Sequence, residues 1–283
     1  MRTPEVIATL SKALLQAGYD QTEAESVARQ YTAWLLKRPL RDLFLLGEAE
    51  LSPAQWQGGL DRLIQGEPLQ YVLGETEFMG LTLHCDSRAL IPRGDSECLL
   101  EKAISLLEQH PKPQIADICT GSGAFALALA HYLPKAQIDA SDISPAALAL
   151  AKENCRLLDL AEQVTFYEGD MAEPLLKQGK TYDFVLCNPP YIASGELPDL
   201  PVQLSFEPKL ALDGGEKGLF PYRVLAKQVD QLLAPGGFLL VEHGDEQQEA
   251  VARLLSTESL TVKETLRDWG NRPRGLLLQK GEK

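Results

Sequence analysis

Apolar residues in the first part of the chain recur at helical spacing. One set, separated by three or four positions, lines a single helix face and consists of Ala24, Val27, Ala28, Tyr31, Trp34 and Leu35. A second helix is predicted to begin at Pro53, because Ser52 and Gln55 match a capping box around it, and to end at Gly66. The pattern therefore predicts a small helical bundle over residues 1–70.

The pattern changes after the predicted bundle. Short β-prone segments run from Gln70 to Ile91, with glycines at positions 74 and 80, and Pro92 follows them. Glycine and proline at such intervals are typical of the turns that join neighbouring strands. We therefore expect a β-hairpin linker over residues 71–93.

From residue 94 onward, helical and strand patterns alternate. Helices are predicted over residues 95–110, through Phe125–Ala130, and from Ser144-Pro145. The predicted strands are Gln114–Ile118, Gln137–Ala140, Val164–Tyr167, Asp183–Cys187, Phe238–Glu242, Leu260–Thr265 and Gly275–Gln279. Such alternation is typical of βαβ units, whose strands form a parallel, doubly wound sheet. The fold class is therefore α/β over residues 94–283.

Composition places the chain among globular proteins. Its 283 residues are 45% hydrophobic and 24% charged, which is enough to build a large α/β domain and a smaller one. No apolar run approaches the roughly 18 residues that suggest a membrane span, and the first residues show no secretory signal pattern. We therefore expect a cytoplasmic protein with no membrane partner.

Charge and cysteine usage disfavour further classes of protein. The 27 basic and 40 acidic residues give a net charge of −13, which opposes the phosphate attraction that supports most nucleic-acid binding. Direct nucleic-acid binding is therefore disfavoured. The five cysteines form no CxxC pair and the four histidines are scattered. We expect no disulfide framework and no metal site.

A glycine-containing loop is predicted where the first strand of the sheet meets its helix. It reads Asp117-Ile118-Cys119-Thr120-Gly121-Ser122-Gly123, and open α/β sheets hold ligands at this position, outside the carboxyl ends of their strands. A dinucleotide fingerprint requires G-x-G-x-x-G, and position 126 is alanine. The loop by itself is weak evidence for a nucleotide ligand.

Two acidic positions strengthen that interpretation. Asp142 ends the second predicted strand, about 20 residues after the glycine loop, where an acidic residue accepts hydrogen bonds from ribose hydroxyls. The alternative role of helix cap is already filled by Ser144 before Pro145. Asp170 follows the third strand, suited to an adenine amine, and Met171 beside it suits either the adenine face or the core.

Both NAD and S-adenosylmethionine contain a nucleoside that such a site accepts. No histidine is placed for hydride chemistry, whereas Asn188-Pro189-Pro190-Tyr191 follows the fourth predicted strand. An amide or aromatic amine nitrogen is a poor nucleophile until its two N–H groups are held. The Asn188 side-chain oxygen and the Pro189 carbonyl can accept them, the prolines stiffen the loop, and Tyr191 can pack on the flat face of the acceptor group. These features favour a methyltransferase that uses S-adenosylmethionine.

The sequence resembles the HemK/PrmC family, the release-factor glutamine methyltransferases. The resemblance covers nearly the whole chain, and the Glu-Pro and Asp-Gly-Gly segments make it more specific than the Asn-Pro-Pro-Tyr motif alone. The segments that carry it are 70–74, 77–81, 90–93, 117–123, 142–148, 188–191, 206–208, 211–215, 218–219, 235–237 and 242–244.

The resemblance implies a fold and an activity. The fold is a class I, Rossmann-like methyltransferase domain over residues 94–283, with a mostly parallel sheet and a C-terminal antiparallel strand, after a helical N-terminal domain and a hairpin linker. The activity is methylation of the glutamine side-chain amide in the Gly-Gly-Gln loop of peptide chain release factors. Residues 1–70, whose periodic apolar faces lie apart from the Asp142 and Asn188 motifs in the sequence, are predicted to dock the protein substrate.

The resemblance also assigns residues. Together with the strand-end reasoning, the cofactor-binding set is Asp117, Cys119, Thr120, Gly121, Ser122, Gly123, Asp142, Asp170, Met171 and Asn188. The acceptor amide falls to Asn188, Pro189, Pro190 and Tyr191, of which Asn188, Pro189 and Tyr191 are the predicted catalytic residues. Two positions depart from the family pattern. Cys119 replaces a usual glycine, and Gly94-Asp95-Ser96 stands where Pro-Glu-Thr or Pro-Asp-Thr is typical.

Three alternatives remain open. A glutamine methyltransferase of a ribosomal protein would share both sites and differ only in docking. An adenine or guanine amine methyltransferase of nucleic acid faces the same lone-pair problem, but the acidic balance and the lack of an evident basic recognition domain disfavour it. A cofactor-binding interaction module would not need an intact motif at Asn188.

Overall fold

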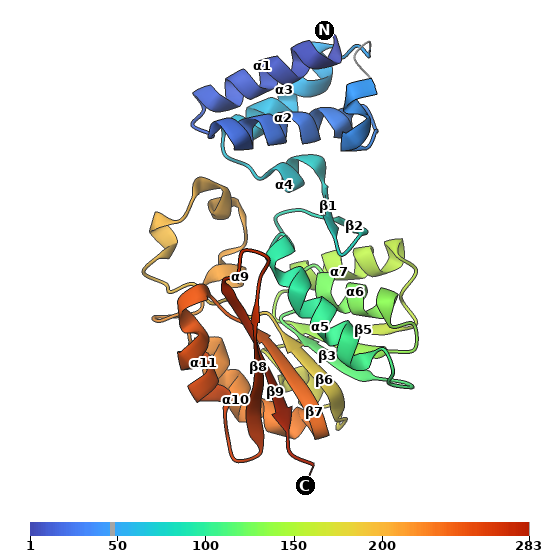
Figure 1. The fold of residues 1–283 in the computed structure, drawn as a ribbon, viewed down its shortest axis with the longest axis vertical. Coiled ribbons are helices and arrows are strands. Elements are labelled where there is room, and N and C mark those ends of the chain that lie inside the picture. Colours follow the sequence, from blue (N-terminus) through green and yellow to red (C-terminus); the bar gives the residue numbers. More distant parts are fainter. Residues whose placement is uncertain (46–48, 283) are drawn as a thin grey trace. The chain divides into compact units, whose positions relative to one another are not determined.

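A computed structural model describes residues 1–45 and 49–282. The chain divides into two compact units, one formed by Met1–Glu75 with Pro201–Phe206 and the other by Thr76–Leu200 with the chain from Glu207 onward. Figure 1 shows the elements of both. None of the helices in the described residues is long and apolar enough to cross a membrane.

The first unit is helical, as its apolar pattern predicts. Its helices are α1 (Thr3–Gln16), α2 (Gln21–Leu35), the 3-10 helix η1 (Leu40–Leu45), α3 (Pro53–Ile64) and α4 (Leu69–Leu73). The Asp20 carboxylate accepts the Glu23 N–H at the start of α2, and the Gln55 side chain accepts the Ser52 N–H at the start of α3. The predicted helix start at Pro53 is therefore confirmed.

Two features of this unit differ from the sequence-based expectation. The predicted linker begins as helix α4, because Leu69, Tyr71 and Val72 bury their side chains in the helical unit and Gly74, at φ 75°, ends the helix. The 3-10 helix η4 (Val202–Phe206) also belongs to the unit, although it lies far along the chain. Burial of Leu69 and Val72 in the core of the unit explains the first placement. The second depends on contacts between segments far apart along the chain, which leave no local sequence signal.

The predicted hairpin is present after α4. Strands β1 (Glu75–Phe78) and β2 (Leu81–His84) form a two-stranded sheet. Gly80 makes the turn at φ 71°, in the left-handed region that glycine adopts without steric cost.

The second unit is built around a seven-stranded sheet. Its strands are β3 (Gln114–Ile118), β4 (Gln137–Asp142), β5 (Val164–Glu168), β6 (Tyr182–Cys187), β7 (Leu233–Glu242), β8 (Leu260–Arg267) and β9 (Pro273–Lys280), in the order β5-β4-β3-β6-β7-β9-β8. Strands β5, β4, β3, β6 and β7 pair in parallel, and β9 pairs antiparallel with both β7 and β8. The predicted sheet, mostly parallel with an antiparallel C-terminal strand, is confirmed.

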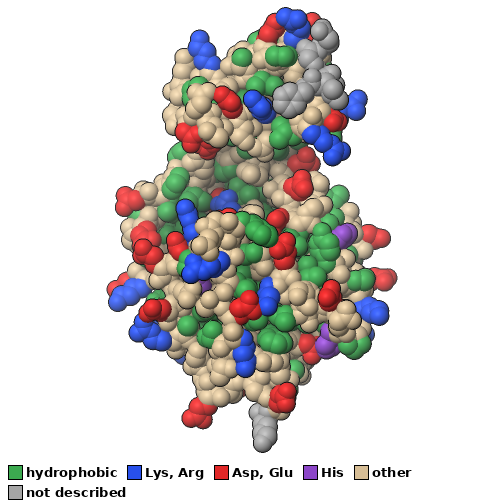
Figure 2. Space-filling view, in the orientation of Figure 1, with side chains coloured by type: hydrophobic (Ala, Val, Ile, Leu, Met, Phe, Trp, Pro, Cys, Tyr) green, Lys and Arg blue, Asp and Glu red, His purple; other side chains and the backbone are tan. Residues whose placement is uncertain are grey.

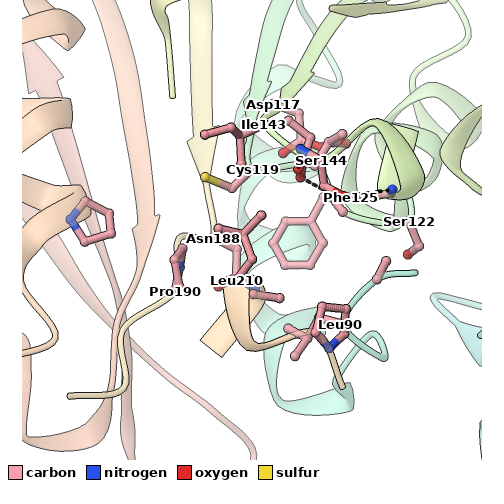
Figure 3. Close-up of a pocket in the computed structure, with 18 of the residues that line it drawn as sticks. Leu90, Asp117, Cys119, Ser122, Phe125, Ile143, Ser144, Asn188, Pro190 and Leu210 are labelled. Atoms are coloured by element: carbon pink, nitrogen blue, oxygen red, sulfur yellow. Dashed lines mark hydrogen bonds between the residues drawn. The ribbon is translucent and has the colours of Figure 1, made fainter. Parts of the chain in front are cut away.

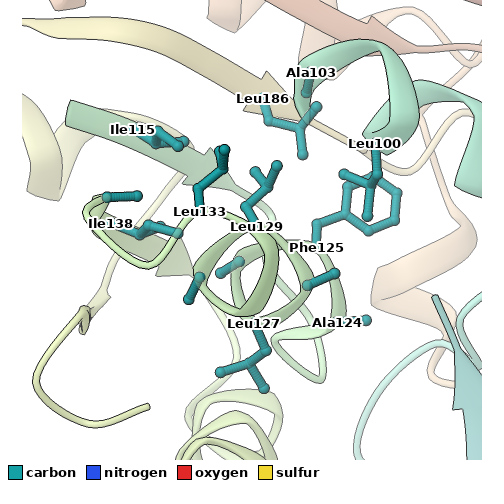
Figure 4. Close-up of a cluster of buried hydrophobic side chains, with 14 of the residues drawn as sticks. Leu100, Ala103, Ile115, Ala124, Phe125, Leu127, Leu129, Leu133, Ile138 and Leu186 are labelled. Atoms are coloured by element: carbon teal, nitrogen blue, oxygen red, sulfur yellow. The ribbon is translucent and has the colours of Figure 1, made fainter. Parts of the chain in front are cut away.

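Helices cover both faces of the sheet. The elements outside it are η2 (Gly94–Ser96), α5 (Glu97–Leu107), α6 (Ala124–Tyr132), α7 (Pro145–Leu157), α8 (Glu173–Leu176), η3 (Leu197–Asp199), α9 (Lys209–Leu212), α10 (Phe220–Leu232), η5 (Asp245–Gln247) and α11 (Gln248–Leu255). Helices α5 and α6 pack on one core cluster, drawn in Figure 4, and α10 and α11 pack on the other. Strand β6 contributes Phe184 and Leu186 to the first cluster and Val185 and Cys187 to the second. Alternate residues of a strand point to opposite faces, so a continuous apolar run marks a strand covered on both sides.

The topology creates a ligand site at one edge. The chain moves outward from β3 to β4 and β5 on one side, then returns to form β6 and β7 on the other. The connections that leave β3 and β6 therefore diverge, and ligands of open α/β sheets bind in the crevice at such a switch point. The predicted cofactor and acceptor motifs both follow strands that end there.

Candidate functional site

A cavity of about 380 Å³ opens at the carboxyl ends of β3, β4 and β6. Its volume falls in the range of small-molecule sites, roughly 300–1,000 Å³. Figure 3 shows side chains from these loops converging with Leu90 and Leu210 around it. The predicted residues that line the cavity are Asp117, Cys119, Thr120, Gly121, Ser122, Asp142, Asp170, Met171, Asn188 and Pro190. Gly123, Pro189 and Tyr191 lie beside these positions, outside the lining.

Asp117 holds the loop after β3 in place. Its buried carboxylate oxygen Oδ2 accepts the Thr120 hydroxyl at 2.6 Å and the Ala126 N–H at 3.2 Å. Burial raises the pKa of Asp117 from 3.8 to about 7, against the opposing effect of those two hydrogen bonds. Asp117 therefore holds the loop in place through these two hydrogen bonds.

This pKa makes the stability of the protein depend on pH. The folded state binds the Asp117 proton more tightly than the unfolded chain does. The contribution of this group to stability is therefore fully present below about pH 4 and is lost as the pH rises through about 7. Asp117→Asn keeps an oxygen acceptor and cannot ionise. We expect it to reduce the loss of unfolding free energy at high pH by a few kcal/mol. Urea unfolding of both proteins from about pH 4 to about pH 8 measures the difference. Equal pH dependence in the two proteins would contradict the prediction.

The loop requires left-handed backbone at three positions. The φ angles are 62° at Cys119, 57° at Gly121 and 82° at Gly123. A Cβ on Gly123 would lie 3.1 Å from Ala151 Cβ, whereas a Cβ on Gly121 would meet no atom within 4 Å. Gly123 therefore allows close packing of α6 on α7, and the Gly121 backbone faces open space. Cys119 adopts a conformation that glycine adopts at less steric cost.

Asp142 joins two of the loops. Its Oδ2 atom accepts the Gly121 N–H at 2.8 Å, and its Oδ1 atom accepts the Ser144 N–H at 2.8 Å. Burial raises the pKa of Asp142 and these backbone hydrogen bonds oppose the rise. Ser144 caps α7 by accepting the Ala147 N–H, as predicted. Since a carboxylate oxygen accepts more than one hydrogen bond, Asp142 retains acceptor capacity toward the cavity.

Met171 lies where it can serve either of its predicted roles, contact with the adenine face or packing in the core. It is buried in the core cluster beneath α10, it lines the cavity, and its sulfur lies 3.6 Å from the Cys119 sulfur. The Ser141 hydroxyl donates to its carbonyl at 2.8 Å, which fixes a residue whose φ is 49°. Asp170 beside it is exposed. The Met171 thioether and the Asp170 carboxylate are therefore both available to a flat ligand in the cavity.

Asn188 is half-buried directly after β6. No other residue in the described parts of the chain forms a hydrogen bond with its side-chain amide. Its oxygen is therefore available to a ligand. Pro189 beside it is buried.

Two glycines make room for this loop. A Cβ on Gly218 would lie 2.1 Å from the Tyr191 carbonyl oxygen, and one on Gly214 would lie 2.8 Å from the Pro190 oxygen. Gln247 Nε2 donates to the same Tyr191 carbonyl at 2.8 Å. Both glycines lie in segments that carry the family resemblance, but a close backbone approach between distant segments has no local sequence pattern.

Part of the cavity wall was not predicted. It is lined by Arg88, Ala89, Leu90, Pro92, Phe125, Ile143, Ser144, Pro208, Leu210, Ala211, Asp213, Phe220 and Pro221. The Glu207 carboxylate accepts the Ile91 N–H and pairs with Arg93, which joins the segment around Leu90 to the segment around Pro208. The motifs that contain Arg93 and Glu207 carried a sequence signal, but nothing in the sequence paired them.

Charges of both signs occur on the molecular surface. Acidic and basic side chains are interspersed on the face drawn in Figure 2. Within residues 1–45 and 49–282, no group of three or more histidine, cysteine, aspartate or glutamate side chains is arranged to hold a metal ion.

Two family descriptions match the chain. Residues 5–74 match the PrmC N-terminal domain, and residues 96–203 match the Methyltransferase small domain. Among solved structures, the hMettl16 catalytic domain in complex with MAT2A 3′UTR hairpin 6 aligns with a TM-score of 0.54 at 18% identity, over 76% of this chain and 80% of that one. Similarity at this identity supports the class I methyltransferase fold.

Similarity to curated proteins extends over most of the chain. The release factor glutamine methyltransferase of Moorella thermoacetica is 45% identical over 83% of this chain and 84% of its own length. The proteins of the same name from Geobacter sulfurreducens and Clostridium acetobutylicum are 39% and 36% identical, over 84% and 76% of this chain and 85% and 75% of their own lengths. At this identity and coverage, the chain belongs to the family of release factor glutamine methyltransferases.

Proposed function

We propose that this protein transfers a methyl group from S-adenosylmethionine to the side-chain amide nitrogen of the glutamine in the Gly-Gly-Gln loop of peptide chain release factors. The observation that carries the proposal is a single cavity that Asp142 and the glycine loop line together with Asn188. A nucleoside site and an amide-holding site therefore adjoin. The curated relatives bear the name of this activity.

The residues around the cavity fit the cofactor. Asp142 offers carboxylate oxygens to ribose hydroxyls, and the backbone at Gly121 approaches the cavity without a side chain in the way. Asp170 and Met171 suit the adenine amine and face. We assign cofactor contacts to this set with Cys119, Thr120, Ser122 and Asn188, and loop support to Asp117 and Gly123.

The acceptor side works mainly by orientation. When bound, S-adenosylmethionine supplies an electrophilic methyl group on a positively charged sulfur. The Asn188 oxygen and the Pro189 carbonyl accept the two N–H groups of the glutamine amide, so that its nitrogen lone pair is held in one direction. The nitrogen can release its proton after methylation, so the chain needs no strong base at this site.

Mass spectrometry tests substrate and reaction together. Purified release factor is incubated with the protein and S-adenosylmethionine and then analysed by tandem mass spectrometry. We expect a mass gain of one methylene unit on the Gly-Gly-Gln glutamine. A gain at another residue, or on a ribosomal protein in place of the release factor, would contradict the proposed substrate.

We propose that the helical residues 1–70 dock the protein substrate. A glutamine side chain offers few atoms for discrimination, so specificity requires a remote interface whose binding energy also orients the loop. The same assay on a short Gly-Gly-Gln peptide provides the comparison. Intact release factor should be methylated far more efficiently than the peptide, and equal efficiency would contradict docking.

Asp142→Ala should weaken cofactor binding. Removing the carboxylate leaves ribose hydroxyls without an acceptor and frees the Gly121 N–H, so we expect a loss of about 1–3 kcal/mol in binding free energy. Calorimetric titration with S-adenosylmethionine measures it. The matched control is Glu168→Ala, which removes an exposed carboxylate paired in register with Asp142 on β5. Equal affinities in the two folded variants would show that Asp142 is structural.

A further inference from the structure

Asn154 is a buried polar residue of α7 that belongs to neither predicted site. Its Oδ1 atom accepts the His84 N–H at 2.7 Å. Its Nδ2 atom donates to the His84 carbonyl at 3.2 Å and to the Ser122 carbonyl at 3.1 Å. One side chain therefore joins the end of strand β2 to the glycine loop that follows β3.

These hydrogen bonds explain why the residue is an asparagine. Its oxygen pairs with a donor, while both N–H groups of the amide pair with backbone carbonyls. An ionised aspartate of the same shape could accept from His84 but could donate to neither carbonyl. Both the amide oxygen and the amide nitrogen have partners, as a buried polar group requires.

Asn154 completes a series of attachments along the glycine loop. The carboxylate that ends β4 accepts the Gly121 N–H, and the buried carboxylate of β3 accepts the Thr120 hydroxyl. Asn154 holds the next residue, Ser122, through its carbonyl. Three consecutive residues of the loop are therefore held by side chains from three different elements, and α7 supplies the third.

The other partner of Asn154 lies in the linker that leads to the unpredicted wall of the cavity. Just beyond His84, the Arg88 guanidinium donates to the carboxylate of Glu153, the neighbour of Asn154 on α7, at 2.8 and 2.7 Å. Four residues of this segment line the cavity, namely Arg88, Ala89, Leu90 and Pro92. One turn of α7 therefore attaches both the linker wall and the glycine-loop wall of the cavity.

We propose that Asn154 is a positioning residue for cofactor binding, which holds the Ser122 carbonyl of the glycine loop against the linker strand β2. The inference rests on the proposed function. Asn154 is not in the cavity lining and acts through Ser122, which is (Figure 3). A loop that is already ordered need not be ordered at the expense of binding free energy. Loss of the attachment should therefore weaken cofactor binding.

Calorimetric titration with S-adenosylmethionine tests the proposal on two variants. Asn154→Ala removes all three hydrogen bonds, whereas Asn154→Asp keeps nearly the shape of asparagine and the acceptor for the His84 N–H. Both lose the donation to the Ser122 carbonyl, so both should bind the cofactor about tenfold more weakly than the wild type. Where the alanine variant does not fold, the aspartate variant carries the test.

The matched control is Tyr182→Phe. It also removes a buried hydrogen bond, from the Tyr182 hydroxyl to Asp139, but at the start of β6, the end of the strand opposite Asn188. We expect this variant to have lower thermal stability and wild-type cofactor affinity. The control therefore separates a general loss of stability from a loss of loop position.

Amide hydrogen exchange without cofactor provides a second readout. The N–H groups of Gly121 and Gly123 should exchange faster in both Asn154 variants than in the wild type, because the loop opens more often. Exchange in β6 should stay unchanged. Wild-type affinity in a folded Asn154→Asp protein, an equal affinity loss in Tyr182→Phe, or unchanged loop exchange would each overturn the proposal. Absence of S-adenosylmethionine binding by the wild-type protein would instead contradict the proposed function, and the exchange measurement would still test the attachment.

Discussion

Asn188→Ala is expected to lower methylation of release factor by on the order of 10² or more while the fold survives. The side chain forms no hydrogen bond within the described residues, so its loss leaves no buried group unpaired in the protein. It does remove the acceptor that holds one N–H of the glutamine amide. Single-turnover kinetics at saturating S-adenosylmethionine isolates the methyl-transfer step.

Asn188→Asp is the matched comparison, since it keeps an oxygen acceptor of nearly the same shape. We expect it to retain more activity than alanine does. Cofactor affinity is measured separately by calorimetry, because Asn188 also belongs to the proposed cofactor site. Wild-type turnover in Asn188→Ala would contradict the proposal that Asn188 holds the acceptor amide.

Gly218→Ala is expected to displace the acceptor loop from its neighbour. The new Cβ would lie 2.1 Å from the Tyr191 carbonyl oxygen and 2.5 Å from Gln247 Nε2, at a φ of 64° that alanine adopts poorly. One of the two backbones must move. We expect methylation to fall by about tenfold or more and the free energy of unfolding by about 1–3 kcal/mol. Kinetics and urea unfolding on the same preparation measure both.

Gly195→Ala provides the control within the neighbouring loop. Gly195 is exposed, and a Cβ there would meet no atom within 4 Å. This variant should match the wild type in rate and stability. A Gly218→Ala protein with the wild-type rate would show that the loop tolerates displacement and that its close packing serves stability alone.

Much of the cavity lining could be predicted from the residues that follow the parallel strands. Asp142 and Asn188 were placed together because parallel strands end at one edge of a sheet, and both line the cavity. The cofactor loop was predicted in the same way. Such a prediction requires only the strand that precedes each residue and the order of the strands in the sheet.

The other cavity wall could not be predicted in this way. Leu90, Leu210 and Phe220 reach the cavity from connections outside the central strands. Phe220 is 64% exposed, and an exposed aromatic residue has no sequence signature that separates it from one in the core. Nonlocal contacts such as the pair between Arg93 and Glu207 set these positions.

Some of the fold was readable and was missed. Helices α10 and α11 follow Asn188 and were not predicted, although Tyr222, Leu225, Val229 and Leu232 recur at helical spacing in α10. The placement of Pro201–Phe206 in the helical unit is different, because it depends on contacts with residues far away along the chain. Periodicity therefore suffices to predict α10, whereas it does not place Pro201–Phe206.

The position of β9 in the sheet has a consequence for synthesis. Strand β7 pairs with β9, not with β8, although β8 comes first along the chain. As the polypeptide emerges, β7 therefore keeps an open, apolar edge until β8 has formed and the chain has turned back. An open strand edge of this kind invites pairing with other chains. A chain that ends before β9 should therefore aggregate more readily than the 283-residue chain, which a comparison of their soluble fractions measures.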